Sequence, residues 1–264
     1  MESYAWDAQD YEQSSSVQQK WARELAAKLG LNSDERILDI GSGDGKVTSE
    51  IAAMVHRGSV VGIDSSGDMI SLAKTRYPQA DWPNLGFRRL DARDLPFEGE
   101  FSVVFSSATL HWVIDHLPVL QDIRRGLRAG GKAFLQMGGE GNAADMVHVV
   151  EGLTRTEDWR EYFTDFTFPY GFHGREQYLQ WLSNVGLHPI RVELIPKDMS
   201  HERSGLESWM RTTWMPYTER VPETKRAEFI EQAVDRYLQR HPIGADGLTH
   251  LGMVRLEVEA AKPS

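Results

Sequence analysis

The feature that most constrains the fold is a glycine-rich turn between an apolar strand and a helix. The strand-like residues RILDI (36–40) lead directly into Gly41-Ser42-Gly43-Asp44-Gly45, and the helix-like stretch KVTSEIAAMV follows. Glycine in such a turn permits positive φ and lets a ligand approach the backbone without meeting a Cβ atom. In doubly wound sheets, ligands bind at the carboxyl ends of the strands, where this turn would lie. The segment therefore predicts an α/β fold with a ligand site after the first strand.

The rest of the N-terminal half repeats this alternation of strand and helix. The further strand-like segments are SVVGI (59–63), LGFRRL (85–90), FSVVF (101–105) and KAFLQM (132–137). Their alternation with helical stretches indicates βαβ units and a parallel sheet with right-handed crossovers. Continuous apolar runs such as VVGI fit a sheet that is covered on both faces. We expect a doubly wound, seven-stranded, mostly parallel Rossmann-like sheet with an inserted helical lid.

After Met137 the pattern changes to helical segments that contain four of the eight tryptophans. We expect a helix capped by Asn142, a helix ending at Gly186, and a strand near 189–195. The tryptophans are explained either by helix packing in the core or by a lid over a pocket. The expected division is an N-terminal helical cap at 1–30, a cofactor-binding core at 31–140, and the helical lid with the last strands at 141–264.

Composition excludes several classes of function. The chain has no cysteine, so disulfides, thiolate metal sites and thiol catalysis are excluded. It has 29 Lys+Arg against 39 Asp+Glu, a formal charge of −10 that opposes binding to nucleic acid. The acidic N-terminus does not resemble a signal peptide, and no apolar run approaches the ~20 residues that span a bilayer. We expect a soluble cytoplasmic protein, with no metal site because the histidines lack spaced carboxylate partners.

The spacing of acidic residues around the glycines indicates the kind of ligand. Asp64 ends the second strand, 64 − 45 = 19 residues after the last glycine, where an acidic side chain commonly accepts hydrogen bonds from ribose hydroxyls. Dinucleotide binders favour GxGxxG, whereas this sequence has GxGxG preceded by Asp39. A carboxylate at that position repels a phosphate but suits a positive amino group. These residues favour S-adenosylmethionine over NAD, and an NAD-binding oxidoreductase is the alternative from another class.

Five segments occur in an order typical of one enzyme superfamily. They are LDIGSGDG (38–45), VVGIDSS (60–66), LDARDLPF (90–97), FSVVFSSATLHW (101–112) and LRAGGKAFLQM (127–137). On these segments the chain resembles the class I S-adenosylmethionine-dependent methyltransferases. SSSVQ near the N-terminus and ATLHW further resemble the branch of trans-aconitate and juvenile hormone acid methyltransferases.

The resemblance implies roles for individual residues. The glycine loop and Ser106 would lie beneath the methionine moiety, Asp64 would hold the ribose, and Asp91-Ala92 would contact the adenine amino group. Met69 would pack on the adenine, and ordinary core packing explains it equally well. The cofactor-binding residues expected on this basis are Asp39, Gly41, Ser42, Gly43, Asp64, Ser65, Met69, Asp91, Ala92 and Ser106.

Enzymes of this branch make methyl esters of small-molecule carboxylates, so the resemblance implies a carboxylic acid acceptor. A carboxylate has a pKa of about 4 and needs no general base at neutral pH. The resemblance assigns its orientation to Gln18 and Trp112, whose side chains are hydrogen-bond donors. His111 is the alternative, a general base for a hydroxyl, amine or carbon acceptor. Arg211 is considered as a clamp for a second carboxylate.

Overall fold

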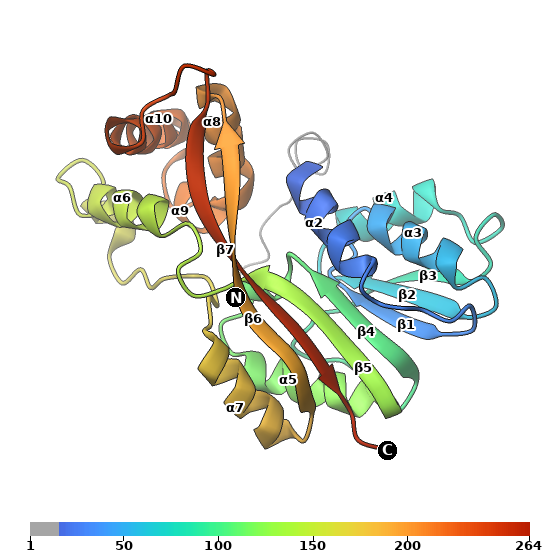
Figure 1. The fold of residues 1–264 in the computed structure, drawn as a ribbon. Helices are drawn as coiled ribbons and strands as arrows, with labels where there is room; N and C mark the ends of the chain where they lie inside the picture. The colour runs from blue at the N-terminus through green and yellow to red at the C-terminus, as the bar shows by residue number, and fades with distance from the viewer. Residues whose placement is uncertain (1–15) are drawn as a thin grey trace.

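The computed structural model describes residues 16–264 and shows a seven-stranded sheet with the strand order β3-β2-β1-β4-β5-β7-β6 (Figure 1). Strands β1 to β5 pair in parallel, and β7 runs antiparallel to both β5 and β6. The expected seven-stranded, mostly parallel α/β sheet is confirmed. The strands are β1 (Arg36–Ile40), β2 (Ser59–Asp64), β3 (Leu85–Arg89), β4 (Phe101–Ser107), β5 (Leu127–Gly138), β6 (His188–His201) and β7 (Thr249–Ala261).

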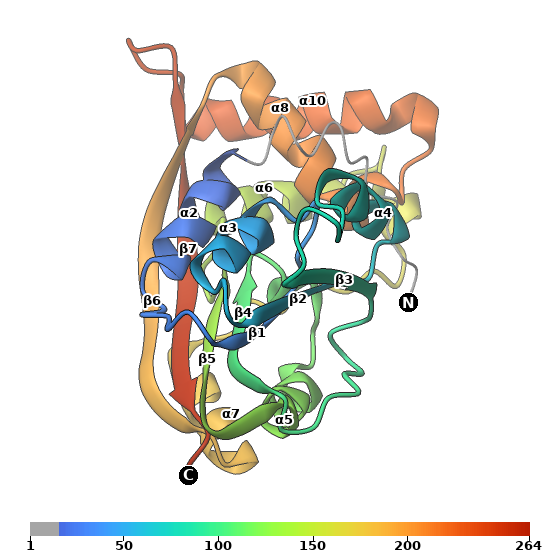
Figure 2. The same ribbon diagram turned by 90° about the vertical axis from the view of Figure 1, so that its right-hand side faces the viewer.

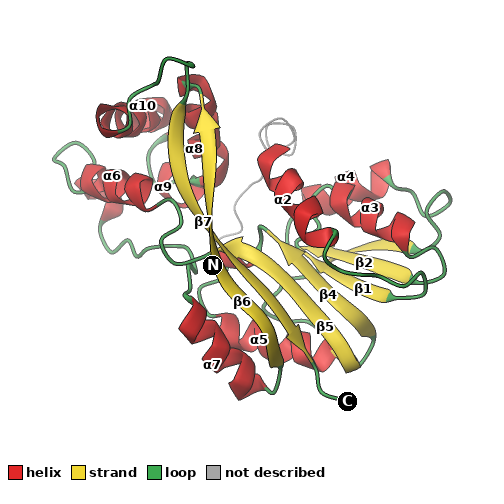
Figure 3. Ribbon diagram, in the orientation of Figure 1, coloured by secondary structure: helices red, strands yellow, loops and turns green. Residues whose placement is uncertain are grey.

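Helices cover both faces of this sheet (Figure 3). The first face carries α2 (Ser16–Ala26), α3 (Lys46–Met54) and α4 (Gly67–Arg76), and the second carries α5 (His116–Gly126) and α7 (Arg175–Val185). Successive strand residues point to opposite faces. Ile37 and Phe105 therefore pack under the first group of helices, while Leu38 and Val104 pack against the second. Double coverage explains why the strands read as continuous apolar runs.

A separate helical cap lies beyond the end of the sheet. Strands β6 and β7 continue past β5 as a two-stranded arm, paired as far as His201 and Thr249, and the arm runs up to the cap helices (Figure 2). Met199, Leu251 and Met253 of the arm are buried in the cap core. None of the helices in residues 16–264 is long and apolar enough to cross a bilayer. The cap helices are α6 (Ala144–Thr154), η2 (Arg160–Phe163), α8 (Arg203–Thr213), α9 (Met215–Thr218) and α10 (Glu223–Arg240).

Three expectations for the C-terminal half need correction. The strand expected near 189–195 extends to His201, because β7 continues to pair with it along the arm. Asn142 does not cap α6; Ala143 holds that position, and Asn142 Oδ1 instead accepts a hydrogen bond from Val254 N at 3.1 Å. Helix α7 falls within the range assigned to the lid, but it packs against helix α5 and against strand β6 of the sheet.

A buried carboxylate fastens the N-terminal helix to the sheet. Glu257 on β7 is 1% exposed and accepts hydrogen bonds from Lys28 Nζ at 2.6 Å, Arg191 Nη1 at 2.8 Å and Gln136 Nε2 at 2.9 Å. Burial alone would raise the pKa of Glu257, but these donors outweigh it and lower the pKa. Lys28 follows α2, so this carboxylate joins α2 to strands β5, β6 and β7.

We expect Glu257→Ala to lower the free energy of unfolding by roughly 2–3 kcal/mol, because it leaves Lys28, Arg191 and Gln136 without their shared acceptor. Urea unfolding measures the change.

Because the folded-state pKa of Glu257 is lowered, the contribution of Glu257 to the free energy of unfolding is present above pH 4.5 and is lost as the pH falls below that value.

The matched control is Glu259→Ala, two residues along β7, whose carboxylate lies 3.5 Å from Lys132 Nζ at the surface. In this variant the free energy of unfolding should fall by less than about 1 kcal/mol. Equal losses in the two variants would contradict a special role for Glu257.

Candidate functional site

The glycine loop lies at the carboxyl end of β1, where the strand order reverses between β1 and β4. Gly41, Gly43 and Gly45 have φ values of 81°, 53° and 82°, which favour glycine. A Cβ atom on Gly41 would lie 1.9 Å from Thr109 Oγ1, so only glycine fits there. A Cβ atom on Gly43 would have no atom of residues 16–264 within 4 Å, so among these residues the backbone there faces open space. The loop can therefore receive a ligand against its backbone.

Asp64 at the end of β2 is tied to this loop. Its Oδ2 accepts a hydrogen bond from Gly43 N at 3.0 Å, and its Oδ1 accepts one from Ser66 N at 2.9 Å. Burial raises the pKa of Asp64 despite these backbone donors. A carboxylate oxygen can accept more than one hydrogen bond, so both oxygens keep capacity for ligand hydroxyls. Ser65 beside it is exposed, and its carbonyl accepts from Arg89 Nε at 3.0 Å.

Two of the expected cofactor residues lie inside the sheet, below the loop. Asp39 is 2% exposed and accepts a hydrogen bond from Thr48 Oγ1 at 2.6 Å, and burial raises its pKa to about 7. Ser106 is fully buried, and its hydroxyl donates to Ile40 O at 2.8 Å, joining β4 to β1. Both side chains thus support the loop from beneath, and their contact with a ligand remains a prediction.

The remaining expected residues lie along the neighbouring strands. Asp91 and Ala92 follow β3, beside Asp64, because Leu90 N donates to Asp64 O at 3.1 Å. The Asp91 carboxylate forms an ion pair with Arg93, whose hydrogen bonds lower the pKa of Asp91. Met69 on α4 is 3% exposed. The structure therefore brings the glycine loop, the end of β2 and the segment after β3 to one edge of the sheet.

Two buried hydroxyls at this edge have no hydrogen-bond partner among the described residues. They are Ser42 Oγ, in the glycine loop, and Ser107 Oγ, at the end of β4. Buried polar groups are normally satisfied, so each of these has capacity for a polar ligand. Ser106, but not Ser107, was among the site residues expected from the sequence. Side-chain alternation along β4 was the available signal, because adjacent residues point to opposite sides.

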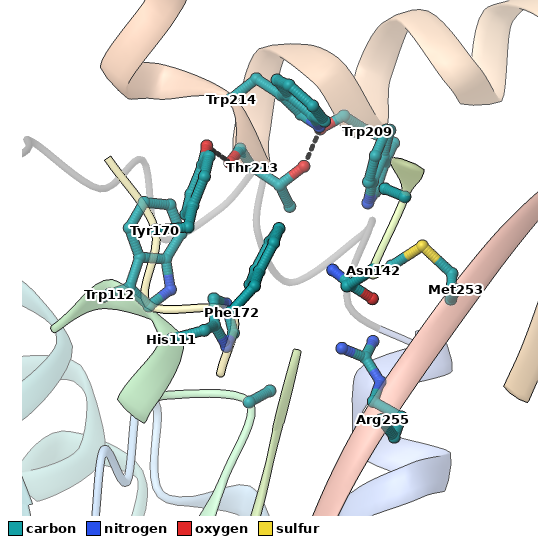
Figure 4. A pocket seen from close by; sticks show the side chains of 12 residues that line it. His111, Trp112, Asn142, Tyr170, Phe172, Trp209, Thr213, Trp214, Met253 and Arg255 are labelled. Atoms are coloured by element: carbon teal, nitrogen blue, oxygen red, sulfur yellow. Dashed lines mark hydrogen bonds between the residues drawn. The ribbon is translucent and has the colours of Figure 1, made fainter. Parts of the chain in front are cut away.

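A pocket adjoins the glycine loop through Ala108 and Thr109. Thr109 packs on Gly41, and Ala108 lines the pocket. The pocket has a volume of about 60 Å³, room for several waters or part of a small molecule. Figure 4 shows its lining, which comes from η1 (Leu110–Trp112), the loop after β5, segment 170–172, α8 and β7. The lining residues are Ala108, His111, Trp112, Asn142, Ala143, Tyr170, Phe172, Trp209, Thr213, Trp214, Met253 and Arg255.

The charged residue of this pocket was not among the site residues expected from the sequence. Arg255 on β7 is 4% exposed, and its guanidinium points into the pocket beside Asn142 (Figure 4). Its Cζ lies 3.9 Å from the ring centroid of Trp21 on α2. Arg211, considered as a clamp, is exposed, donates to Ser208 Oγ at 3.1 Å and does not line the pocket. A charged residue inside a mostly apolar strand was the signal that could have identified Arg255.

His111 is held as a neutral imidazole. Its Nδ1 accepts a hydrogen bond from Gly138 N at 3.4 Å, so the proton of the neutral ring belongs on Nε2. Burial, followed by the nearby positive charge of Arg255, lowers the pKa of His111 to about 3. A base this weak removes protons poorly at neutral pH. The geometry suits His111 to hydrogen-bond donation rather than to general-base catalysis.

The two predicted donors differ in what the structure describes. Trp112 lines the pocket, half-buried, with its ring edge-on to Tyr170 at a centroid distance of 5.3 Å. Gln18 belongs to α2, one turn before Trp21, but its side chain lies outside the described residues. The structure thus brings His111 and Trp112 together with Arg255, and the role of Gln18 stays a prediction.

We expect the ring protons of His111 to show no titration between about pH 5 and 8, because burial and Arg255 disfavour its charged form. The chemical shifts of the histidine ring protons, followed by NMR across this pH range, measure the titration. The signals that are absent from the spectrum of the His111→Gln variant are those of His111. His250 serves as an internal reference, since its hydrogen bond to Asp198 raises its pKa above 6.5. A His111 midpoint near 6.5 would contradict the buried, neutral imidazole.

Known proteins resemble this chain over most of its length. A family model for a methyltransferase domain matches residues 37–131. The chain is 30% identical to an uncharacterized methyltransferase of Schizosaccharomyces pombe, over 97% of this chain and 98% of that protein. It is 24% identical to trans-aconitate 2-methyltransferase of Sinorhizobium medicae, over 98% of this chain and 99% of that enzyme.

A solved structure shares the fold. It is phosphoethanolamine N-methyltransferase 2 of Haemonchus contortus, in complex with phosphomonomethylethanolamine and S-adenosylhomocysteine. It superposes with a TM-score of 0.61 at 21% identity, over 97% of this chain and 57% of that chain.

Proposed function

This chain belongs to the class I S-adenosylmethionine-dependent methyltransferases, and from that premise we propose that it methylates a carboxylate of a small acid to give a methyl ester. The observation that carries the proposal is the buried guanidinium of Arg255 in a pocket beside the glycine loop. Arginine is suited to bidentate binding of a carboxylate. Trans-aconitate 2-methyltransferases, relatives at 24–25% identity over nearly the whole chain, are named for a carboxylic acid.

The residues at the end of the sheet fit the cofactor, S-adenosylmethionine, which supplies an electrophilic methyl group on a sulfonium. The open backbone at Gly43 and the unsatisfied hydroxyls of Ser42 and Ser107 suit its amino acid portion. Asp64 suits the ribose hydroxyls, and the Asp91-Ala92 segment lies next along the same edge for the adenine. The placement of the pocket beside Gly41 would bring an acceptor next to the methyl group.

The chain's own residues then orient the acceptor. Arg255 would hold the carboxylate, and Nε2–H of His111 and the indole N–H of Trp112 would donate to it, with Gln18 as a further donor from α2. With the cofactor bound, one carboxylate oxygen would form the new O–CH₃ bond as the carbon–sulfur bond of the sulfonium broke. The electron pair of the broken bond would stay on sulfur. No proton is transferred, so no base is needed. Orientation of this kind can lower the activation free energy by about 7–11 kcal/mol.

The cap and the N-terminal helix would close the site. Trp21 of α2 covers the guanidinium of Arg255, while Trp209 and Trp214 of the cap form the opposite wall. Excluding water strengthens the interaction between the guanidinium and a carboxylate and protects the sulfonium. The pocket tryptophans therefore support the lid interpretation for this part of the chain.

We expect Asp64→Asn to weaken S-adenosylhomocysteine binding at least tenfold, because an ionised acceptor contributes about 1.5–3 kcal/mol per hydrogen bond. Titration calorimetry measures the dissociation constant. Asp68→Asn, an exposed carboxylate in the first turn of α4, is the matched control and should leave it unchanged. An unaltered constant in a folded Asp64→Asn protein would remove Asp64 from the ribose site.

We expect Arg255→Gln to lower kcat/KM for a carboxylate acceptor by roughly ten- to a thousandfold while S-adenosylhomocysteine still binds, since it removes one charged anchor worth about 1.5–4 kcal/mol. Arg211→Gln, which changes an exposed arginine, is the control and should retain full activity. Mass spectrometry follows the ester, and the rate should stay flat from about pH 6 to 8.

Two results would contradict the ester chemistry. One is a methylated product that resists alkaline hydrolysis. The other is a rate that rises through a pKa near 6.5 and is lost in His111→Gln. Either would indicate base-assisted methylation of a hydroxyl, amine or carbon.

A further inference from the structure

The walls of the acceptor pocket present mainly apolar surface. Tyr170 and Phe172 lie parallel, with ring centroids 5.2 Å apart and an interplanar angle of 7°. The polar atoms of this wall are directed into the protein: Tyr170 Oη donates to Thr213 O at 2.8 Å, and Thr213 Oγ1 donates to Trp209 O at 2.5 Å (Figure 4). The rings of Trp112, Trp209 and Trp214 and the side chain of Met253 complete the lining. An acceptor would therefore meet aromatic rings and other apolar groups over much of its surface.

The pocket offers positive charge at one place. Arg255 is the only Lys or Arg among the twelve described lining residues. His111 contributes no charge, because burial and the neighbouring guanidinium lower its pKa to about 3. Arg211, the other arginine considered for this role, is exposed and lies outside the lining.

The residues that the structure does not describe can add no basic side chain. Residues 1–19 contain no Lys or Arg and four acidic residues, and the first basic residue, Lys20, is exposed on α2. The chain as a whole carries a formal charge of −10, which repels polyanions at long range. Apart from the sulfonium of the cofactor, which faces the reacting carboxylate, the chain therefore supplies one guanidinium to the acceptor from the lining that the structure describes.

Building on the proposed ester chemistry, we infer that the acceptor carries a single carboxylate on an apolar body, and that compact di- and tricarboxylates are rejected. One carboxylate can pair with the guanidinium of Arg255. A second carboxylate on a compact skeleton would lie among the rings without a cation, and burying an unpaired charge is strongly unfavourable. The apolar body, in contrast, gains from contact with the ring surfaces.

Three acids test this inference with the full chain and S-adenosylmethionine: 3-phenylpropanoate, phenylsuccinate and trans-aconitate. Phenylsuccinate is 3-phenylpropanoate with one added carboxylate, so this pair isolates the second charge. We expect kcat/KM for methyl ester formation to be at least about a hundredfold higher for 3-phenylpropanoate than for either polyacid. Calorimetry on protein saturated with S-adenosylhomocysteine should show the same order of binding.

The outcomes separate the inference from the function on which it rests. Equal or better methylation of phenylsuccinate or trans-aconitate would overturn the inference and leave the ester chemistry intact. Failure of all three acids to bind the loaded protein would also overturn it. Methylation of 3-phenylpropanol or 3-phenylpropylamine, with none of the acids methylated, would instead overturn the proposed function.

A second cation should relax this selectivity. Met253 lines the pocket two residues before Arg255 on β7, so the two side chains share one side of the strand. Met253→Lys should raise the ratio of phenylsuccinate to 3-phenylpropanoate activity at least tenfold, and Met253→Gln should not. Thermal unfolding checks both variants. A folded Met253→Lys protein with an unchanged activity ratio would contradict the charge argument. If the variant does not fold, the comparison of the three acids on the wild-type protein tests the inference.

Discussion

Gly41 lies so close to Thr109 that no side chain fits between them, and this contact joins the two halves of the site. It places the first residues after β4 directly against the loop after β1. Most of the residues proposed to bind the cofactor lie in or beside the loops after β1 to β3, whereas the pocket begins at Ala108 and continues through η1. Close packing at one glycine thus sets the position of the proposed acceptor pocket relative to the glycine loop. This position matters because methyl transfer needs the cofactor and the acceptor to be close together.

Strand β7 connects this site to the rest of the molecule. Arg255 and Glu257 are two residues apart and so share one face, the face that α2 covers. Glu257 fastens the end of α2 through Lys28, while Arg255 lies under Trp21 of the same helix. The first residues of the strand, including Leu251 and Met253, lie in the cap core, before the strand enters the sheet. One strand therefore links the sheet, the N-terminal helix, the pocket and the cap.

Burial sets the charges that the chemistry uses. It lowers the pKa of His111 to about 3 and raises the pKa of Asp39 to about 7. A guanidinium, such as that of Arg255, stays ionised in proteins. The pocket consequently contains one fixed positive charge, one neutral imidazole and a wall of aromatic rings. This combination favours an anionic acceptor that needs no proton removed, which is the character of a carboxylate.

Local patterns determined the fold and the cofactor edge. Apolar runs, glycines that tolerate positive φ and an acidic residue at the end of β2 act through neighbouring residues, so the strand–helix order and the positions of Gly41, Gly43 and Asp64 followed from the sequence. Only the tertiary structure decided the acceptor site. In the sequence Arg255 is one charged residue of a strand and Ser107 is a neighbour of Ser106. Only the structure shows that the Arg255 side chain and the Ser107 hydroxyl are buried. Asn142 and α7 likewise took positions set by β7 and α5, because burial and partners come from segments far apart in the chain.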